Sequence, residues 1–154
     1  MIADPTSWLL LCRTVRFGDT DAAGVMHFHQ LLRWCHEAYE ESLERYGLAP
    51  AEVFPRPDWA GEAPPIGLPI VACGAEFRRP LLVGDPLSIQ LSPEALGSDG
   101  FEVSYAFSRG EEPVARGFTR HLAIAADSRR RCPLPEGIRR WLEASGLRQG
   151  IRPL

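Results

Sequence analysis

The 154-residue sequence contains no lysine: all 17 of its basic residues are arginine. Schiff-base chemistry and P-loop nucleotide binding both use a lysine, so neither is expected of this chain. The sequence also has no apolar run long enough to span a membrane. Residues 1–5 lack the basic start and apolar core of a signal peptide. We therefore expect a cytoplasmic protein with no membrane segment.

Cysteines are few and scattered, at Cys12, Cys35, Cys73 and Cys132, and no two of them form a CxxC pair. This spacing argues against a disulfide framework and against a zinc site. In a reducing compartment we expect the four to be small buried apolar residues.

The formal net charge of −3 gives no support to nucleic-acid binding. The charge is unevenly distributed, with nine arginines against three acids from Val114 onward and five arginines against ten acids in the first 62 residues. A basic C-terminal segment suits the phosphates of a ligand, although most such arginines in proteins are solvated surface residues. The length and composition predict one domain, residues 1–154.

Hydrophobic periodicity predicts one long helix, Phe28–Tyr46, which ends at Gly47. Its predicted apolar face consists of Phe28, Leu31, Leu32, Cys35, Ala38, Tyr39, Ser42, Leu43 and Tyr46. We predict a strand before it (8–16), a proline-rich loop after it (49–67), antiparallel strands with period two (68–77, 87–91, 101–107 and 114–126), and a short helix (136–144).

This order is typical of an α+β fold in which an antiparallel sheet wraps around one central helix. A single long helix leaves apolar sheet surface and strand edges uncovered, so we expect a homo-oligomer.

The most informative segment, residues 17–28, reads FGDTDAAGVMHF and places two aspartates in a glycine-containing loop just before the long helix. A helix N-terminus presents unpaired N–H groups and the positive end of a dipole. Such groups polarise a carbonyl while a nearby carboxylate attacks it, so the arrangement suits acyl transfer.

Together with the strand segment PIVACGAEF (residues 69–77), this loop resembles the hotdog-fold thioesterases of the 4-hydroxybenzoyl-CoA type. The resemblance extends over about residues 13–125. It is strongest to the aromatic-acyl branch, which includes the 1,4-dihydroxy-2-naphthoyl-CoA hydrolases of phylloquinone and menaquinone synthesis. It implies a hotdog fold, an acyl-CoA substrate, no cofactor and no metal, and a homotetramer built as a dimer of dimers.

The resemblance implies that Asp21 is the catalytic carboxylate, acting either as a nucleophile that forms a mixed anhydride or as the activator of a water. It assigns the oxyanion to the backbone N–H of Phe28. It also implies substrate contacts at Gly24, His27 and Leu68, with the aryl pocket lying partly in a neighbouring subunit. Asp19 is expected to organise the loop through local hydrogen bonds.

His36 matches the helix position at which the hydroxybenzoyl enzyme contacts the ring hydroxyl with a carboxylate. A histidine there argues against 4-hydroxybenzoyl specificity itself. It suits hydrogen bonding to a phenolic hydroxyl, and it equally suits an ordinary half-buried helix residue.

The coenzyme A phosphates must be held differently from the hydroxybenzoyl enzyme, because its basic run is replaced here by Leu96-Gly97-Ser98-Asp99-Gly100. The candidate phosphate ligands are arginine side chains and turn N–H groups: Arg78, Arg79, Arg116, Arg120, residues 129–131, and Ser98.

The same residues allow four other interpretations. Asp19 and Asp21 are also compatible with plain turns, whereas a calcium loop is rejected at Ala23 and Gln30. A metal site at His27, His29 and His36 is disfavoured, because the first two rings are expected to diverge. Another hotdog branch uses a helix glutamate as its catalytic group, but here the helix glutamates are expected on the polar face: Glu37, Glu40, Glu41 and Glu44. Two rival functions remain: a short-chain acyl-CoA or acyl-carrier thioesterase, and a non-catalytic acyl-CoA-binding protein.

Overall fold

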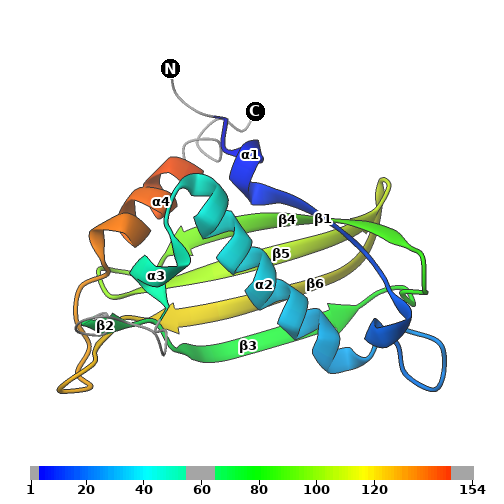
Figure 1. Ribbon diagram of the computed structural model, residues 1–154, viewed down its shortest axis with the longest axis horizontal. Helices are drawn as coiled ribbons and strands as arrows, with labels where there is room; N and C mark the ends of the chain where they lie inside the picture. The colour runs from blue at the N-terminus through cyan, green and yellow to red at the C-terminus, as the bar shows by residue number, and fades with distance from the viewer. Residues whose placement is uncertain (1–3, 55–64, 147–154) are drawn as a thin grey trace.

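The computed structural model describes residues 4–54 and 65–146. A five-stranded antiparallel sheet curves around one long helix, α2 (Phe28–Tyr46), which lies across its inner face (Figure 1). The sheet strands are β1 (Leu10–Thr14), β3 (Ile70–Phe77), β4 (Pro86–Ala95), β5 (Gly100–Arg109) and β6 (Glu112–Leu122). The predicted α+β hotdog architecture is confirmed.

The strand order is β1-β4-β5-β6-β3, so β1 and β3 form the two edges of the sheet. Two short strands, β2 (Ile66–Gly67) and β7 (Ile124–Ala125), pair with each other beside it. Along β5 and β6 buried and exposed residues alternate, which gives the sheet an apolar inner face and a polar outer face.

Helix α2 buries Leu31, Cys35, Ala38, Tyr39, Ser42 and Leu43, as its periodicity predicts. Two residues differ from the prediction. Phe28 is 69% exposed, whereas Trp34, which the predicted face omits, is only 5% exposed. Phe28 is the first residue of the helix. Trp34 follows Leu31 by three positions, so the helical period places it on the buried face, and β1 residues line the same groove beside it.

The structure corrects several predicted boundaries. Trp8 and Leu9 belong to a helical turn, α1 (Thr6–Leu9), and not to a strand. The Thr6 N–H donates to Asp4 Oδ1 at 3.0 Å, and this local hydrogen bond starts a turn where the apolar run alone suggested a strand. Val15 and Arg16 lie beyond β1.

The predicted 49–67 loop contains a short helix, α3 (Pro50–Val53), and β2; residues 55–64 lie outside the described part of the chain. The strand predicted to begin at Leu68 begins at Ile70, and the predicted final strand is divided into β6 and β7. The last helix, α4 (Glu136–Gly146), is confirmed and extends two residues further than predicted.

All four cysteines are free, but the expectation that all are buried is wrong. Cys35 is fully buried under the sheet, and burial raises the pKa of its thiol to about 12. Cys12 and Cys73 are exposed, and both lie on edge strands. Cys12 follows the buried Leu11, so its side chain is on the opposite face of β1.

Candidate active site

Residues 19–27, the Asp21 loop, form a tight hairpin between the 3-10 turn η1 (Phe17–Asp19) and the start of α2. The Asp21 N–H donates to Val25 O at 2.9 Å, and Thr20 and Met26 form an isolated antiparallel bridge. Gly24 closes the turn with its N–H on Asp21 O at 3.0 Å and a φ of +81°, which favours glycine. The loop therefore holds Asp21 at its exposed tip.

The two aspartates of the loop are used differently. Asp19 is half-buried, and both of its carboxylate oxygens accept hydrogen bonds: from the Arg16 N–H at 2.8 Å and from Gln30 Nε2 at 2.8 Å. Asp21 is exposed, and its carboxylate accepts one bond in the described structure, from the Ala23 N–H at 2.8 Å on Oδ1. The loop-organising role predicted for Asp19 is confirmed, and Asp21 has a carboxylate oxygen without a protein partner in the described residues.

The first turn of α2 begins beside this loop. The His27 N–H donates to Asp19 O at 2.9 Å, which ties the helix start to the loop. Within the described residues no acceptor is bound to the N–H of Phe28, the first residue of the helix. An unpaired N–H at a helix start is a ready donor to a developing oxyanion.

The His27 and His29 rings do not diverge as the sequence suggested. His27 is the N-cap of α2, and its extended backbone turns the ring over the first turn, with its centroid 4.1 Å from that of His29. Their Nδ1 atoms are in direct contact. Within residues 4–54 and 65–146, no group of three or more histidine, cysteine or acidic side chains is arranged to hold a metal ion.

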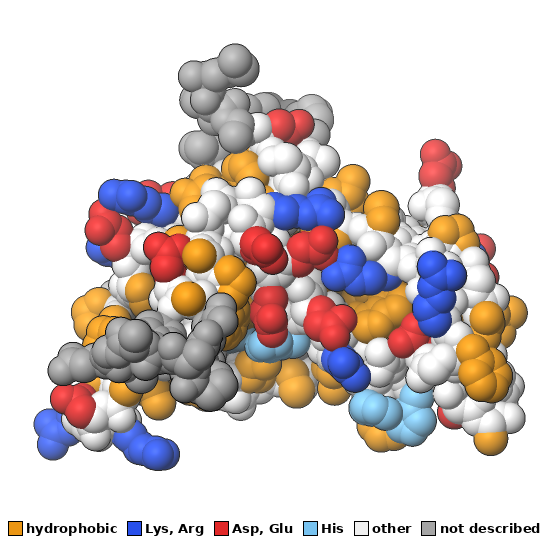
Figure 2. Space-filling view, in the orientation of Figure 1, with side chains coloured by type: hydrophobic (Ala, Val, Ile, Leu, Met, Phe, Trp, Pro, Cys, Tyr) orange, Lys and Arg blue, Asp and Glu red, His pale blue; other side chains and the backbone are white. Residues whose placement is uncertain are grey.

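His36 lies two turns further along α2 and is half-buried. Its Nδ1 is 2.7 Å from Glu40 Oε1, and its ring meets those of Tyr39 and Phe54. The Glu40 contact fixes one ring nitrogen and leaves the other for a different partner. The remaining helix glutamates are on the polar face as expected, where acidic and arginine side chains gather (Figure 2).

Leu68 takes part in a buried polar chain that the sequence did not reveal. Its carbonyl oxygen lies 3.3 Å from Nδ1 of His121, whose Nε2 is 2.9 Å from the Thr119 hydroxyl. Tyr105 bonds that hydroxyl in turn, at 2.9 Å. His121 is fully buried, and desolvation lowers its pKa to about 4. Period two places His121 on the inner face of a strand, but sequence alone does not say which inner residues are polar partners.

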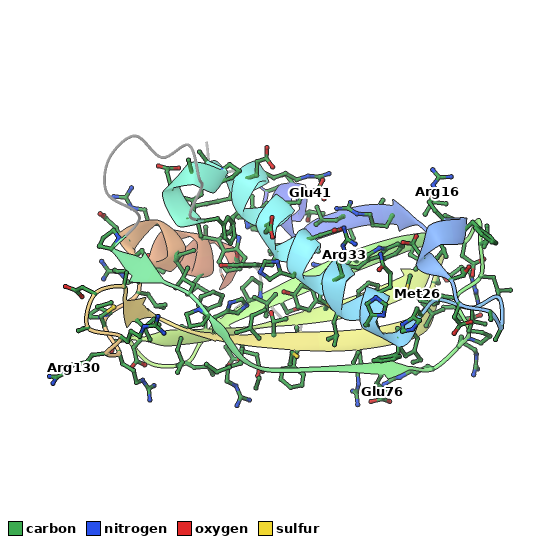
Figure 3. All side chains as sticks on the ribbon, turned by 60° about the horizontal axis from the view of Figure 1, so that its bottom comes forward. Arg16, Met26, Arg33, Glu41, Glu76 and Arg130 are labelled. Carbon is green, nitrogen blue, oxygen red and sulfur yellow. The ribbon has the colours of Figure 1, made fainter. Side chains whose placement is uncertain are left out.

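The candidate phosphate ligands occupy different places. Arg116 and Arg120 lie on the outer face of β6 and form ion pairs with Glu76 and Glu102, at 2.7 and 2.9 Å. Figure 3 shows Glu76 projecting from β3 on the side away from α2. Ser98 is in the exposed β4–β5 turn, and residues 129–131 follow β7. The structure therefore does not gather these residues at the Asp21 loop.

Arg78 and Arg79 lie just before a segment that contacts the Asp21 loop. They follow β3 directly and precede Leu81, whose carbonyl accepts the Met26 N–H at 2.8 Å. Their nearest carboxylates are distant, at 3.9 Å for Arg78–Glu76 and 3.7 Å for Arg79–Glu112. Both guanidinium groups are thus weakly paired in the described structure.

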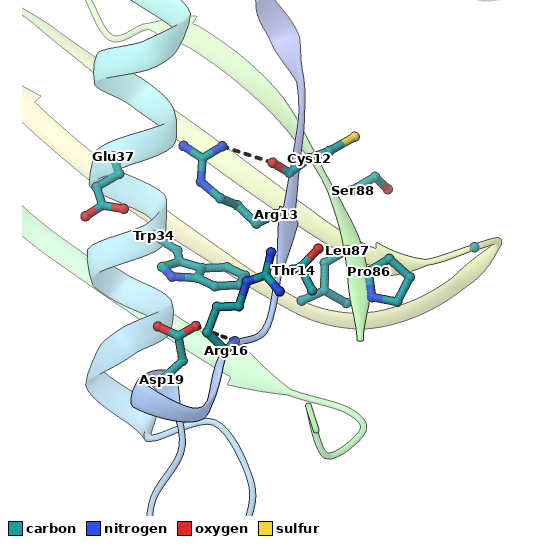
Figure 4. A pocket seen from close by; sticks show the side chains of 11 residues that line it. Cys12, Arg13, Thr14, Arg16, Asp19, Trp34, Glu37, Pro86, Leu87 and Ser88 are labelled. Atoms are coloured by element: carbon teal, nitrogen blue, oxygen red, sulfur yellow. Dashed lines mark hydrogen bonds between the residues drawn. The ribbon is translucent and has the colours of Figure 1, made fainter. Parts of the chain in front are cut away.

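An open groove of about 730 Å³ separates α2 from β1 and ends beside the Asp21 loop (Figure 4). Trp34 lies between the two elements, and Arg13 and Arg16 extend over it. The groove has little unbalanced charge, because Arg13 pairs with Glu41 at 2.6 Å and Arg33 pairs with Glu37 at 3.0 Å. Its lining residues are Cys12, Arg13, Thr14, Arg16, Asp19, Trp34, Glu37, Pro86, Leu87, Ser88 and Gly110.

Comparison with protein families gives a match between residues 15–142 and the family described as the thioesterase-like superfamily. The chain belongs to the thioesterase-like superfamily. The matched residues include the Asp21 loop, α2 and every strand from β2 to β7.

Relatives within this superfamily are similar over almost their whole length. A 1,4-dihydroxy-2-naphthoyl-CoA hydrolase of Prochlorococcus marinus (strain MIT 9303) is 59% identical over 144 residues, 94% of this chain and 95% of the relative. The crystal structure of a Prochlorococcus marinus MIT 9313 protein matches with a TM-score of 0.91 and 58% identity, covering 94% of this chain and all of that one.

A third relative is Slr0204, a 1,4-dihydroxy-2-naphthoyl-CoA thioesterase from Synechocystis, with a TM-score of 0.78 and 31% identity over 87% of this chain and 94% of its own.

Within the described part of this thioesterase-superfamily chain, no helix has the length and apolar character to cross a membrane.

Proposed function

We propose that this member of the thioesterase-like superfamily hydrolyses 1,4-dihydroxy-2-naphthoyl-CoA, in phylloquinone or menaquinone synthesis. One observation carries the proposal: Asp21, an exposed carboxylate with an oxygen available, sits on the tight loop that leads directly into α2, where the N–H of Phe28 has no acceptor among the described residues. These are the two groups that thioester hydrolysis requires. The 59% identity to a hydrolase of that name supports the choice of acyl group.

In the proposed reaction, the Asp21 carboxylate attacks the thioester carbonyl, the C–S bond breaks, and the coenzyme A thiolate leaves with the electron pair. Water then hydrolyses the mixed anhydride to the free acid and restores Asp21. In the alternative route, Asp21 takes a proton from the attacking water. Both routes form an oxyanion, to which the Phe28 N–H donates; one such donor contributes about 3–4 kcal/mol in known acyl-transfer sites.

We expect the substrate to contact residues on and near the Asp21 loop. Gly24 and His27 belong to this loop, and His36 offers a ring nitrogen to a naphthol hydroxyl. Leu68 belongs to the far end of the inner face, so we expect it to meet the substrate bound at a neighbouring subunit. For the phosphates we favour Arg78 and Arg79 over Arg116 and Arg120, because the carboxylate contacts of the first two are looser.

The free edge of the sheet supports a homo-oligomer. Among the described strands, β3 pairs on one side only, and Ile70, Val71 and Phe77 along it are 40%, 51% and 38% exposed. Such an edge favours pairing with a second copy. Phe17 and Phe28, exposed at the catalytic end, extend this apolar surface. We propose a cytoplasmic homotetramer, a dimer of dimers, in which each aryl pocket is completed by a neighbour.

The test is thiol release from four thioesters of coenzyme A, with 1,4-dihydroxy-2-naphthoyl, 4-hydroxybenzoyl, benzoyl and butyryl groups. We expect turnover of the naphthoyl substrate to dominate. Asp21→Asn, which keeps the side-chain shape and the turn acceptor but removes the negative charge, should lower kcat by about 10²–10⁴-fold. Asp19→Asn is the comparison variant, since Asp19 supports the loop without reaching substrate.

Turnover of butyryl-CoA alone would replace the aromatic assignment with a short-chain thioesterase. Binding of all four compounds without thiol release would favour the non-catalytic binding protein. Full activity in Asp21→Asn would remove Asp21 from the mechanism while leaving the substrate assignment intact.

A further inference from the structure

The turn formed by residues 81–85 contacts both ends of the Asp21 loop region. Before the loop, Val15 exchanges two backbone hydrogen bonds with the turn: its N–H donates to Asp85 O at 3.0 Å, and its carbonyl accepts the Gly84 N–H at 2.8 Å. After the loop, the Met26 N–H donates to Leu81 O at 2.8 Å. Val25 and Leu82 form an isolated antiparallel bridge.

One carboxylate holds this turn closed. Asp85 Oδ2 accepts the Leu82 N–H at 2.9 Å, and the Asp85 N–H donates back to Leu82 O at 3.0 Å. The same Oδ2 accepts Nη1 of Arg109 at 2.7 Å. The Leu82 N–H and the Arg109 guanidinium together hold the pKa of Asp85 below its ordinary value, so this carboxylate is ionised at neutral pH.

Arg109 is the last residue of β5 and lies 24 residues beyond Asp85 in the sequence. Its second guanidinium nitrogen, Nη2, donates to Glu112 Oε1 at 3.0 Å across the β5–β6 hairpin. Both nitrogens of the guanidinium fork are therefore bonded, and the side chain connects the end of the central strand β5 to the turn that contacts the loop.

We propose that Asp85 and Arg109 are positioning residues for catalysis: the pair fixes the turn, and the turn fixes Asp21 relative to the Phe28 N–H. Neither side chain needs to touch substrate. This inference rests on the proposed thioesterase function. A displacement of the catalytic groups by about 1 Å costs up to about 10²-fold in rate, so loss of the pair should reduce turnover more than substrate affinity.

The test compares Asp85→Asn and Arg109→Gln with Arg45→Gln. Arg45 pairs with Glu41 at 3.0 Å and its Nη1 donates to Leu10 O at 3.5 Å, so it joins α2 to β1 at the end of the helix away from the Asp21 loop. We expect the two turn variants to lower kcat about 10-fold or more with KM changed less than twofold. Arg45→Gln should leave kcat near the wild-type value, whatever its effect on the melting temperature. Arg109→Lys, which keeps a charge on Asp85, should recover part of the lost kcat.

Amide hydrogen exchange provides a readout that does not need activity. Exchange of the Val15 and Met26 amides, which donate to the turn, should accelerate in Asp85→Asn and Arg109→Gln and not in Arg45→Gln. Unchanged exchange, or an equal loss of kcat in all three variants, would overturn the positioning role. Absence of wild-type turnover with accelerated exchange would instead reject the proposed function and retain the support of the loop by this pair.

Discussion

Asp19 and Asp21 are two residues apart, and their surroundings give them different chemistry. Both oxygens of Asp19 are bonded by Arg16 and Gln30, whereas Asp21 gives one oxygen to the turn and is otherwise exposed. A fully bonded carboxylate is a structural anchor, because using it in a reaction would break the hydrogen bonds that hold the loop. The loop thus uses Asp19 as its anchor and leaves one oxygen of Asp21 available for the reactive role that we propose.

His121 illustrates a second property that belongs to one residue. Because a carbonyl can only accept, Nδ1 of His121 must donate to Leu68 O, and Nε2 of the neutral ring accepts from the Thr119 hydroxyl. The ring also stacks on Phe101 with centroids 4.6 Å apart. The folded protein therefore keeps this histidine neutral.

This predicts a pH-dependent free energy of unfolding. The pKa of His121 is lowered from 6.5 to about 4 in the folded state, so between these values only the unfolded chain binds the proton. The free energy of unfolding should therefore fall as pH decreases from about 6.5 to 4, by about 3 kcal/mol in total. Urea unfolding at several pH values, with wild type and His121→Gln compared, isolates this contribution. Equal pH slopes for the two proteins would contradict it.

At the scale of elements, α2 meets the sheet closely at one position on β6. A Cβ added at Gly117 would lie 2.9 Å from the Cys35 sulfur and 3.1 Å from Gly74 O. The absence of a side chain there lets the helix and the sheet approach each other beneath Cys35, which is fully buried.

Gly117→Ala should therefore destabilise the fold by about 1–3 kcal/mol, because neither the buried sulfur nor the β3 backbone can move away easily. Gly74→Ala is the matched control on the neighbouring strand. Its added Cβ meets the ring of Phe118, 2.7 Å away, and this half-buried ring can rotate toward solvent. Denaturant unfolding measures the free energy of unfolding of both variants. Equal destabilisation of the two would show that the close approach of helix and sheet at Gly117 does not determine the effect.

For the whole molecule, we expect the exposed β3 edge to determine how copies associate. Val71, 51% exposed, lies near one end of β3, and Phe77 lies at the other. Two antiparallel copies of β3 would bring the catalytic end of one subunit beside the Leu68 end of the next, as the proposed shared pocket requires.

Val71→Lys should break this association, because a lysine on an edge strand opposes pairing with a second strand. We expect light scattering to report a smaller species and thiol release to fall with it. Ala126→Lys adds the same charge at an exposed position outside β3 and should leave the assembly intact. An unchanged assembly in Val71→Lys would place the interface elsewhere on the molecule.

The sequence by itself determined the features that depend on near neighbours along the chain. The period of α2, the alternation in β5 and β6, the Gly47 stop and the Gly24 turn all follow from spacings of a few residues, and the structure confirms them. The Asp21 motif was also recognisable, because its carboxylates, its glycine and the helix start lie within ten residues.

The tertiary structure decided whatever depends on which distant segments meet. Arg116 and Arg120 are neutralised because β3 and β5 bring carboxylates beside them. Asp85 and Arg109 meet only when the sheet forms. Ion pairing and the desolvation of polar groups arise from contacts across the fold, so a local pattern cannot specify them.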